Sequence, residues 1–245
     1  MSIGILRVRL RAAFLILASS AVSAVAAQVT GQVTVATANL AAPAHLDLSV
    51  VCWLTPLANQ TVPPVSAQNP LPHARLVQKN KVFEPHVLVV QVGAKVDFPN
   101  RDPFFHNVFS LFNGKRFDLG LYEAGSTRSV QFDRAGISYI FCNIHPEMSA
   151  VVVVVDTPYF AISDARGDLT IPSVPPGRYR LNFWEEHCAP TTLAGLSRQI
   201  TVSEDATSMG NIRLQESSET VTSHLNKYGK PYDPEVFSSP LYLKP

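Results

Sequence analysis

The sequence predicts an all-β protein built from two β-sandwiches. Its apolar runs are short, rich in Val, Ile and Phe, and separated by Pro, Gly, Asn or Asp, and none of them keeps a helical period after residue 27. At 245 residues, the chain is also longer than one small sandwich needs. We therefore expect strands at 29–36, 46–54, 87–92, 94–99, 129–133, 137–142, 150–156, 159–163, 168–171 and 178–184.

The first 27 residues have the features of a cleaved secretory signal. Arg7, Arg9 and Arg11 precede an apolar run over 12–18, and the small residues 24–27 suit signal peptidase. A membrane anchor is the alternative, but serines interrupt the run before it reaches the roughly 20 apolar residues that a spanning helix needs. We expect a periplasmic or secreted product with no stable membrane insertion after cleavage.

The charge balance argues against nucleic-acid binding. The chain has 20 basic and 19 acidic residues, and three of the basic ones lie in the signal. The mature protein would therefore carry a net charge of −2 with neutral histidines, and it lacks the basic surplus that supplies most nucleic-acid affinity.

Two boundaries divide the chain. The stretch 55–72 holds five prolines, which cannot donate in a β-ladder and mark a linker or long loop. The second boundary lies at 156–158, after the run 151–155, whose unbroken valines predict a strand covered on both faces. The resulting division is a signal at 1–27, one sandwich formed by 28–75 and 157–215, a second at 76–156, and an extended tail at 216–245.

One cluster of residues has the spacing of a metal site. Cys142, His145 and Met148 form C-x2-H-x2-M directly after a predicted strand, and His106 lies in a proline-bounded loop upstream. Each residue alone is weak support, because a lone His, Cys or Met is usually a surface or core side chain. Together, two imidazoles, a thiolate and a weak axial thioether form the ligand set of electron-transfer copper sites.

The region 82–156 resembles the cupredoxins, the family of amicyanin and plastocyanin. It has an F-x-P opening at 83–85, a V-x-x-G-x-x-V hairpin at 90–96, and a strand at 136–142 that leads into the cysteine. The short ligand loop is most similar to the amicyanin branch. This resemblance implies a Greek-key sandwich that holds one type 1 (blue) copper ion.

The resemblance also implies a role for each ligand. Cys142 would give the short sulfur bond, His106 and His145 the two imidazole nitrogens, and Met148 the axial ligand. Asn107 would hydrogen-bond toward the backbone near Cys142 and tie the two ligand loops together.

The rest of the chain resembles a second family, the carboxypeptidase regulatory-like (transthyretin-like) sandwiches. A D-x-x-G turn at 164–167 precedes a V-P-P-G-x-Y hairpin at 174–179, and 29–35 with 48–54 are similar to the opening strands of that family. The resemblance implies that the copper domain is inserted in, or joined to, this sandwich. It says little about function.

Cys52, Cys142 and Cys188 are an odd number of cysteines for an exported protein. If Cys142 binds a metal, Cys52 and Cys188 form a possible disulfide, and two separately buried thiols are the alternative.

The remaining histidines and acidic residues do not indicate a second metal site. Solvated or capping roles suffice for the histidines His45, His73, His86, His187 and His224. Turn or surface roles suffice for the acidic residues Asp97, Asp102, Asp118, Glu123 and Asp133. No nucleophile elbow or phosphate-binding glycine loop occurs in the sequence.

We therefore expect a one-electron carrier and not an enzyme. By analogy, a c-type cytochrome or a dehydrogenase is its redox partner, and the His145 edge, flanked by Pro146 and by Phe104 or Phe105, is the electron port. The alternatives are a non-redox binding module with a structural copper domain, and a copper storage or delivery protein.

Overall fold

The computed structural model describes residues 27–36, 49–57, 74–111, 114–217 and 224–232. The expected signal, apart from Ala27, lies outside these residues, as do most of the proline-rich stretch and much of the tail. Within the described ranges the chain is all-β, as predicted, with seventeen strands and one short helix. No helix among the described residues is long and apolar enough to cross a membrane.

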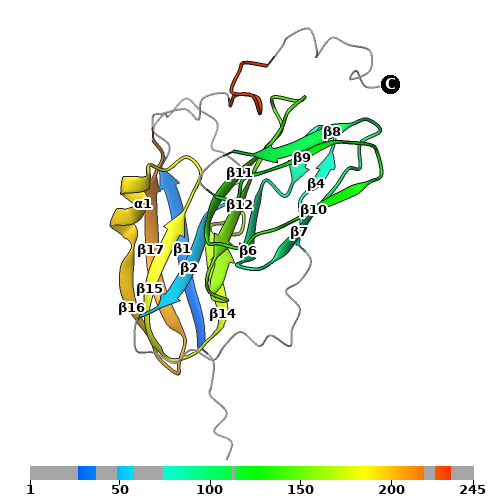
Figure 1. Cartoon of the computed structure of the whole chain (residues 1–245). Coiled ribbons are helices and arrows are strands. Elements are labelled where there is room, and N and C mark those ends of the chain that lie inside the picture. The colour runs from blue at the N-terminus through cyan, green and yellow to red at the C-terminus, as the bar shows by residue number, and fades with distance from the viewer. Residues whose placement is uncertain (1–26, 37–48, 58–73, 112–113, 218–223, 233–245) are drawn as a thin grey trace, which may run out of the picture.

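The first sandwich joins the beginning of the chain to its last third. Strand β1 (Ala27–Ala36) lies between β14 (Asp168–Val174), to which it is antiparallel, and β17 (Thr207–Gln215), to which it is parallel. A second sheet has the order β13 (Phe160–Ile162), β2 (Val51–Pro56), β15 (Gly177–Trp184) and β16 (Arg198–Val202). Figure 1 shows these strands together on the left, beside the helix α1 (Pro190–Leu196).

The second sandwich is formed by the middle of the chain. Its five-stranded sheet has the order β6 (Val87–Gln91), β12 (Ser149–Val155), β11 (Gly136–Cys142), β8 (His106–Ser110) and β9 (Phe117–Tyr122). The facing sheet contains β10 (Thr127–Gln131), β7 (Lys95–Pro99) and β3 (Ala74–Arg75), and β4 (Val77–Lys79) pairs with β5 (Val82–Glu84).

Strand β12 belongs to both hydrophobic cores. Val151, Val153 and Val155 pack into the core of the first sandwich, whereas Val152 and Val154 pack into that of the second. This follows from the two-residue period of a strand, which sends alternate side chains to opposite faces. The prediction of a strand covered on both sides is confirmed, and the sheet that carries the ligand loop is supported on both faces.

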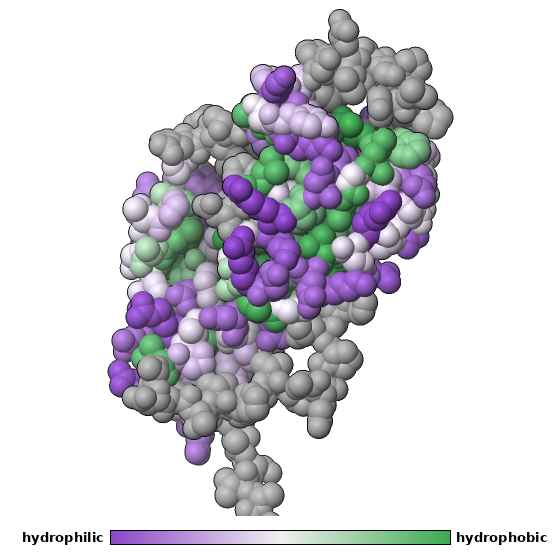
Figure 2. All heavy atoms as spheres, viewed as in Figure 1, coloured by the Kyte–Doolittle hydropathy of each residue, from purple (hydrophilic) through white to green (hydrophobic). Residues whose placement is uncertain are grey.

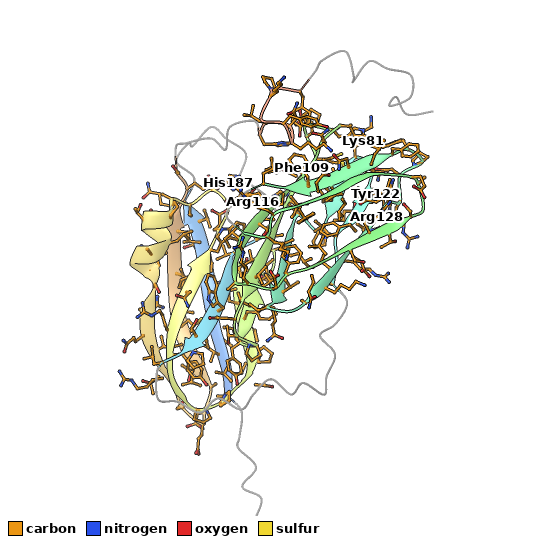
Figure 3. All side chains as sticks on the ribbon, in the orientation of Figure 1. Lys81, Phe109, Arg116, Tyr122, Arg128 and His187 are labelled. Carbon is orange, nitrogen blue, oxygen red and sulfur yellow. The ribbon has the colours of Figure 1, made fainter. Side chains whose placement is uncertain are left out.

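Figure 2 shows hydrophobic residues over the upper half of the viewed face, in the region of the second sandwich, with hydrophilic residues around them. Figure 3 labels Lys81 near the upper end of this sandwich. Lower on the same sandwich, the Arg128 guanidinium lies 5.9 Å from the centre of the Tyr122 ring. Arg128 thus covers a fully buried aromatic ring from the solvent side.

Candidate metal centre

Two neighbouring strands and one tight loop position the predicted ligands. Cys142 ends β11 and His106 begins β8, and these antiparallel strands pair Cys142 with Val108. The loop to β12 then carries His145 and Met148. It is closed by two backbone hydrogen bonds, from the Met148 N–H to the His145 carbonyl (3.1 Å) and from the Cys142 N–H to the Met148 carbonyl (3.2 Å).

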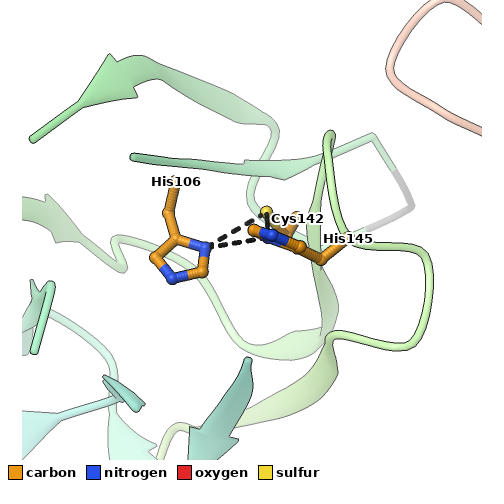
Figure 4. A group of neighbouring side chains, drawn as sticks. All are labelled: His106, Cys142 and His145. Atoms are coloured by element: carbon orange, nitrogen blue, oxygen red, sulfur yellow. Dashed lines mark hydrogen bonds between the residues drawn. The ribbon is translucent and has the colours of Figure 1, made fainter. Parts of the chain in front are cut away.

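Three of the four predicted ligands converge on one point (Figure 4). The Sγ atom of Cys142 lies 3.6 Å from Nδ1 of His106 and 3.5 Å from Nδ1 of His145, and the two Nδ1 atoms are 3.1 Å apart. All three side chains are buried. An ion bonded trigonally at about 2.0 Å to nitrogen and about 2.3 Å to sulfur would place its donors roughly 3.5–3.8 Å apart. The donor atoms therefore fit one metal ion.

Asp102 prepares His106 to bind a metal. Its carboxylate lies 2.8 Å from Nε2 of His106 and accepts the backbone N–H groups of Asn80 (2.6 Å) and Lys81 (3.0 Å). Burial alone would raise the pKa of Asp102, but these three hydrogen bonds together lower it. An ionised carboxylate holds the imidazole hydrogen on Nε2, so Nδ1 presents its lone pair to the site.

The position of Asp102 differs from the one expected from the sequence. A turn or surface role was expected for it, but it is 5 % exposed and contacts a predicted ligand. The only signal in the sequence was its position four residues before His106.

Both imidazoles favour the neutral form that binds metals. Burial, together with repulsion by His106 and Lys81, lowers the pKa of His145 to about 4. Burial also lowers the pKa of His106 and outweighs the opposing effect of Asp102. At neutral pH neither ring must lose a proton before it can donate a nitrogen lone pair.

The sulfur of Cys142 is buried but surrounded by donors. Burial raises the pKa of this thiol, whereas hydrogen bonds from the backbone N–H groups of Asn107, Ile144 and His145 lower it. These three donors stabilise a thiolate, and a bound cation would supply the remaining compensation for its charge.

Met148 is fully buried in the core of the second sandwich. The backbone hydrogen bonds that close the loop also fix its position beside Cys142 and His145.

Asn107 ties the two ligand segments together, but through its main chain. Its carbonyl accepts the N–H of Asn143 at 3.0 Å, whereas its side chain donates to Asp118 at 2.7 Å. Asp118 lies on β9. The pairing of β8 with β9 shifts register between Asn107 and Phe109, next to this contact. The expected hydrogen bond toward the backbone near Cys142 is therefore made by the Asn107 carbonyl and not by its side chain.

The expected electron port is more enclosed than its sequence suggested. His145 is only 5 % exposed. The centroid of the Phe104 ring lies 5.5 Å from that of the His145 ring and 5.3 Å from that of the His106 ring. Phe105 is 48 % exposed. Phe104 therefore packs on the imidazoles, whereas Phe105, the residue before His106, is half exposed.

The possible disulfide is not formed. Cys52 and Cys188 are separate buried thiols. Cys52 lies in the middle of a sheet between Ala161 and Phe183, whereas Cys188 lies beyond the end of β15 and donates to the Gln215 carbonyl. Burial raises the pKa of each thiol to about 12, so both behave as small hydrophobic groups.

The other described histidines are not part of this group of donor atoms. His86 contacts Glu186 and His187 contacts Glu185, and these contacts raise the pKa of both histidines. His224 stacks on Phe141. His45 and His73 lie outside the described residues. Within the part of the chain that the structure describes, one group of three or more His, Cys, Asp or Glu side chains is spaced to hold a metal ion. It consists of His106, Cys142 and His145.

No protein-family model matches the sequence, and no curated protein matches it. Similar solved structures include a purple cupredoxin from Nitrosopumilus maritimus, with 26% identity, 34% of this chain and 99% of that chain covered, and a TM-score of 0.31. A reduced amicyanin mutant shares 26% identity over 34% of this chain and 82% of its own, with a TM-score of 0.32. A reduced Cu(I) amicyanin mutant at pH 4 shares 22% identity over 42% of this chain and 91% of its own, with a TM-score of 0.33. Because these TM-scores are near 0.3, the geometry of the site itself carries the function proposed below.

Proposed function

We propose that this chain is a periplasmic or secreted type 1 copper protein that carries one electron at a time. The observation that supports this most is the convergence of two Nδ1 atoms and one Sγ atom, all within 4.8 Å of one another and all buried. Two imidazoles with a thiolate favour copper over harder cations such as magnesium or calcium. Met148, fixed in the same loop, would hold the ion as a fourth, weaker ligand.

Copper in such a site supplies reversible one-electron exchange between Cu(I) and Cu(II). The chain supplies a ligand set that does not rearrange. Asp102 fixes the orientation of His106, three backbone N–H groups fix the Cys142 sulfur, and two backbone hydrogen bonds close the loop that carries His145. A rigid set of this kind lowers the reorganisation that accompanies electron transfer, which favours a carrier over an enzyme.

The proposed partner is a redox protein such as a c-type cytochrome or a dehydrogenase. Phe105, which precedes His106 in the sequence and is half exposed, is the side chain through which such a partner would approach. We also propose that 28–75 and 157–215 form one transthyretin-like sandwich into which 76–156 is inserted, with 1–27 as the export signal and 216–245 as the tail.

A redox titration of the copper-loaded full chain tests this function. We expect one reversible one-electron wave with one copper per chain. Met148→Gln should keep the copper and lower the potential, because a harder axial donor favours Cu(II). A bound copper with no reversible wave would indicate a structural metal, and transfer of the copper to a chelator within minutes would indicate delivery. Either result would reject the carrier.

A further inference from the structure

Residues 224–232 lie against the loop that carries the predicted ligands, although more than 75 residues separate the two segments in sequence. Figure 1 shows this segment in red above the end of β11, and in Figure 4 its ribbon lies beside the loop of Cys142 and His145. The resemblance to copper proteins ends at residue 156, so this segment belongs to a part of the chain with no assigned role.

The segment contacts three successive points of the ligand loop. The Tyr232 hydroxyl donates to the backbone carbonyl of Cys142 at 2.8 Å. The Lys227 N–H donates to Oδ1 of Asn143 at 2.9 Å. Nε2 of His224 lies 2.7 Å from the Pro146 carbonyl, and because a carbonyl can only accept, Nε2 is the donor.

Ring packing and an ion pair reinforce these hydrogen bonds. The His224 ring stacks on Phe141, the residue before the predicted thiolate ligand, with centroids 3.9 Å apart, and Nδ1 of His224 lies 3.1 Å from the Tyr232 hydroxyl. Nζ of Lys227 lies 2.9 Å from Asp118, whose other oxygen accepts the Asn107 side chain. The segment is thus connected to the residues that follow both Cys142 and His106.

We propose that residues 224–232 are a structural part of the metal centre, in which His224 and Tyr232 are positioning residues that hold the ligand loop in its metal-binding conformation. They act through the carbonyl groups of Cys142 and Pro146. A ligand can leave the metal only when the loop opens, and opening must break these contacts. The segment therefore slows metal release and protects the loop in the metal-free protein.

Two conservative variants of the full chain test this role, which rests on the proposed copper function. Tyr232→Phe removes one hydroxyl and keeps the ring, and His224→Phe keeps a ring for stacking on Phe141 but removes the donor to Pro146. Tyr228→Phe is the matched control, because it removes a hydroxyl from the same segment at a side chain that is 72 % exposed. The readouts are copper transfer to a chelator and, in the metal-free protein, amide hydrogen exchange of residues 142–148.

Each loop-contact variant should release copper about fivefold faster and exchange the loop amides faster by a similar factor, as expected for the loss of one net hydrogen bond. The control should match the wild type. Unchanged rates in both loop-contact variants, or an equal change in the control, would overturn the inference. If the wild-type protein binds no copper, the proposed function fails, whereas exchange in the metal-free protein still decides whether this segment holds the loop.

Discussion

Asp102→Asn changes one charge and one hydrogen-bonding pattern next to a proposed ligand. In the native protein Oδ1 of Asp102 accepts the Asn80 N–H, and Oδ2 accepts the Lys81 N–H and faces Nε2 of His106. An asparagine has one oxygen, so its NH₂ group must face either Asn80 or the Lys81 and His106 pair. In the first orientation two donors oppose each other, and a buried donor without an acceptor costs about 1–3 kcal/mol.

In the second orientation the asparagine NH₂ donates to Nε2 and moves the imidazole hydrogen to Nδ1, where a metal would bind. Loss of such a carboxylate partner typically lowers metal affinity about 10–100-fold. Competition titration against a chelator measures this change in the wild type, in Asp102→Asn and in Asp133→Asn. Asp133 is a suitable control because it pairs with Lys115 at the surface, away from the site. Wild-type copper affinity in a folded Asp102→Asn variant would refute the proposed role of Asp102.

Three further outcomes follow from the structure. The pKa of His145 lies near 4 in the folded protein and near 6.5 when unfolded, so only the unfolded chain takes up this proton as the pH falls through that window. The metal-free protein should therefore lose urea stability between pH 6.5 and 4, and His145→Gln should reduce that loss; an equal loss in both proteins would contradict the assignment. Gly167→Ala should cost more than Gly125→Ala in denaturant unfolding, since both have positive φ but an added Cβ meets the Val33 carbonyl at 2.2 Å only at Gly167. Thiol counting on denatured, metal-free protein should find three free thiols, and a count of one would restore the disulfide.

Local spacing predicted the ligand loop because a short loop after a strand leaves little freedom. Cys142, His145 and Met148 lie within seven residues, and the strands on either side fix both ends of the loop. Strand β12, which is covered on both faces, could also be predicted from the sequence, since five consecutive valines leave no polar face. His106 could be placed only because its residue type completes the ligand set.

The features that escaped prediction depend on contacts distant in sequence. Asp102 is fixed by backbone groups of Asn80 and Lys81, about twenty residues upstream, which no spacing rule connects to it. Strand β17 was missed because Gly210, with φ of +73°, breaks the alternation between the buried Met209 and Ile212. The contact of Tyr232 with Cys142 spans 90 residues and connects a polar tail to a loop.

The most direct test of the copper centre is the visible absorption spectrum of the copper-loaded full chain, with Cys142→Ser beside it. A thiolate bound to Cu(II) between two imidazoles gives an intense charge-transfer band. We expect that band in the wild-type protein and its complete loss in Cys142→Ser. A copper-loaded wild type without the band, or a band that survives in Cys142→Ser, would contradict a centre formed by His106, Cys142 and His145.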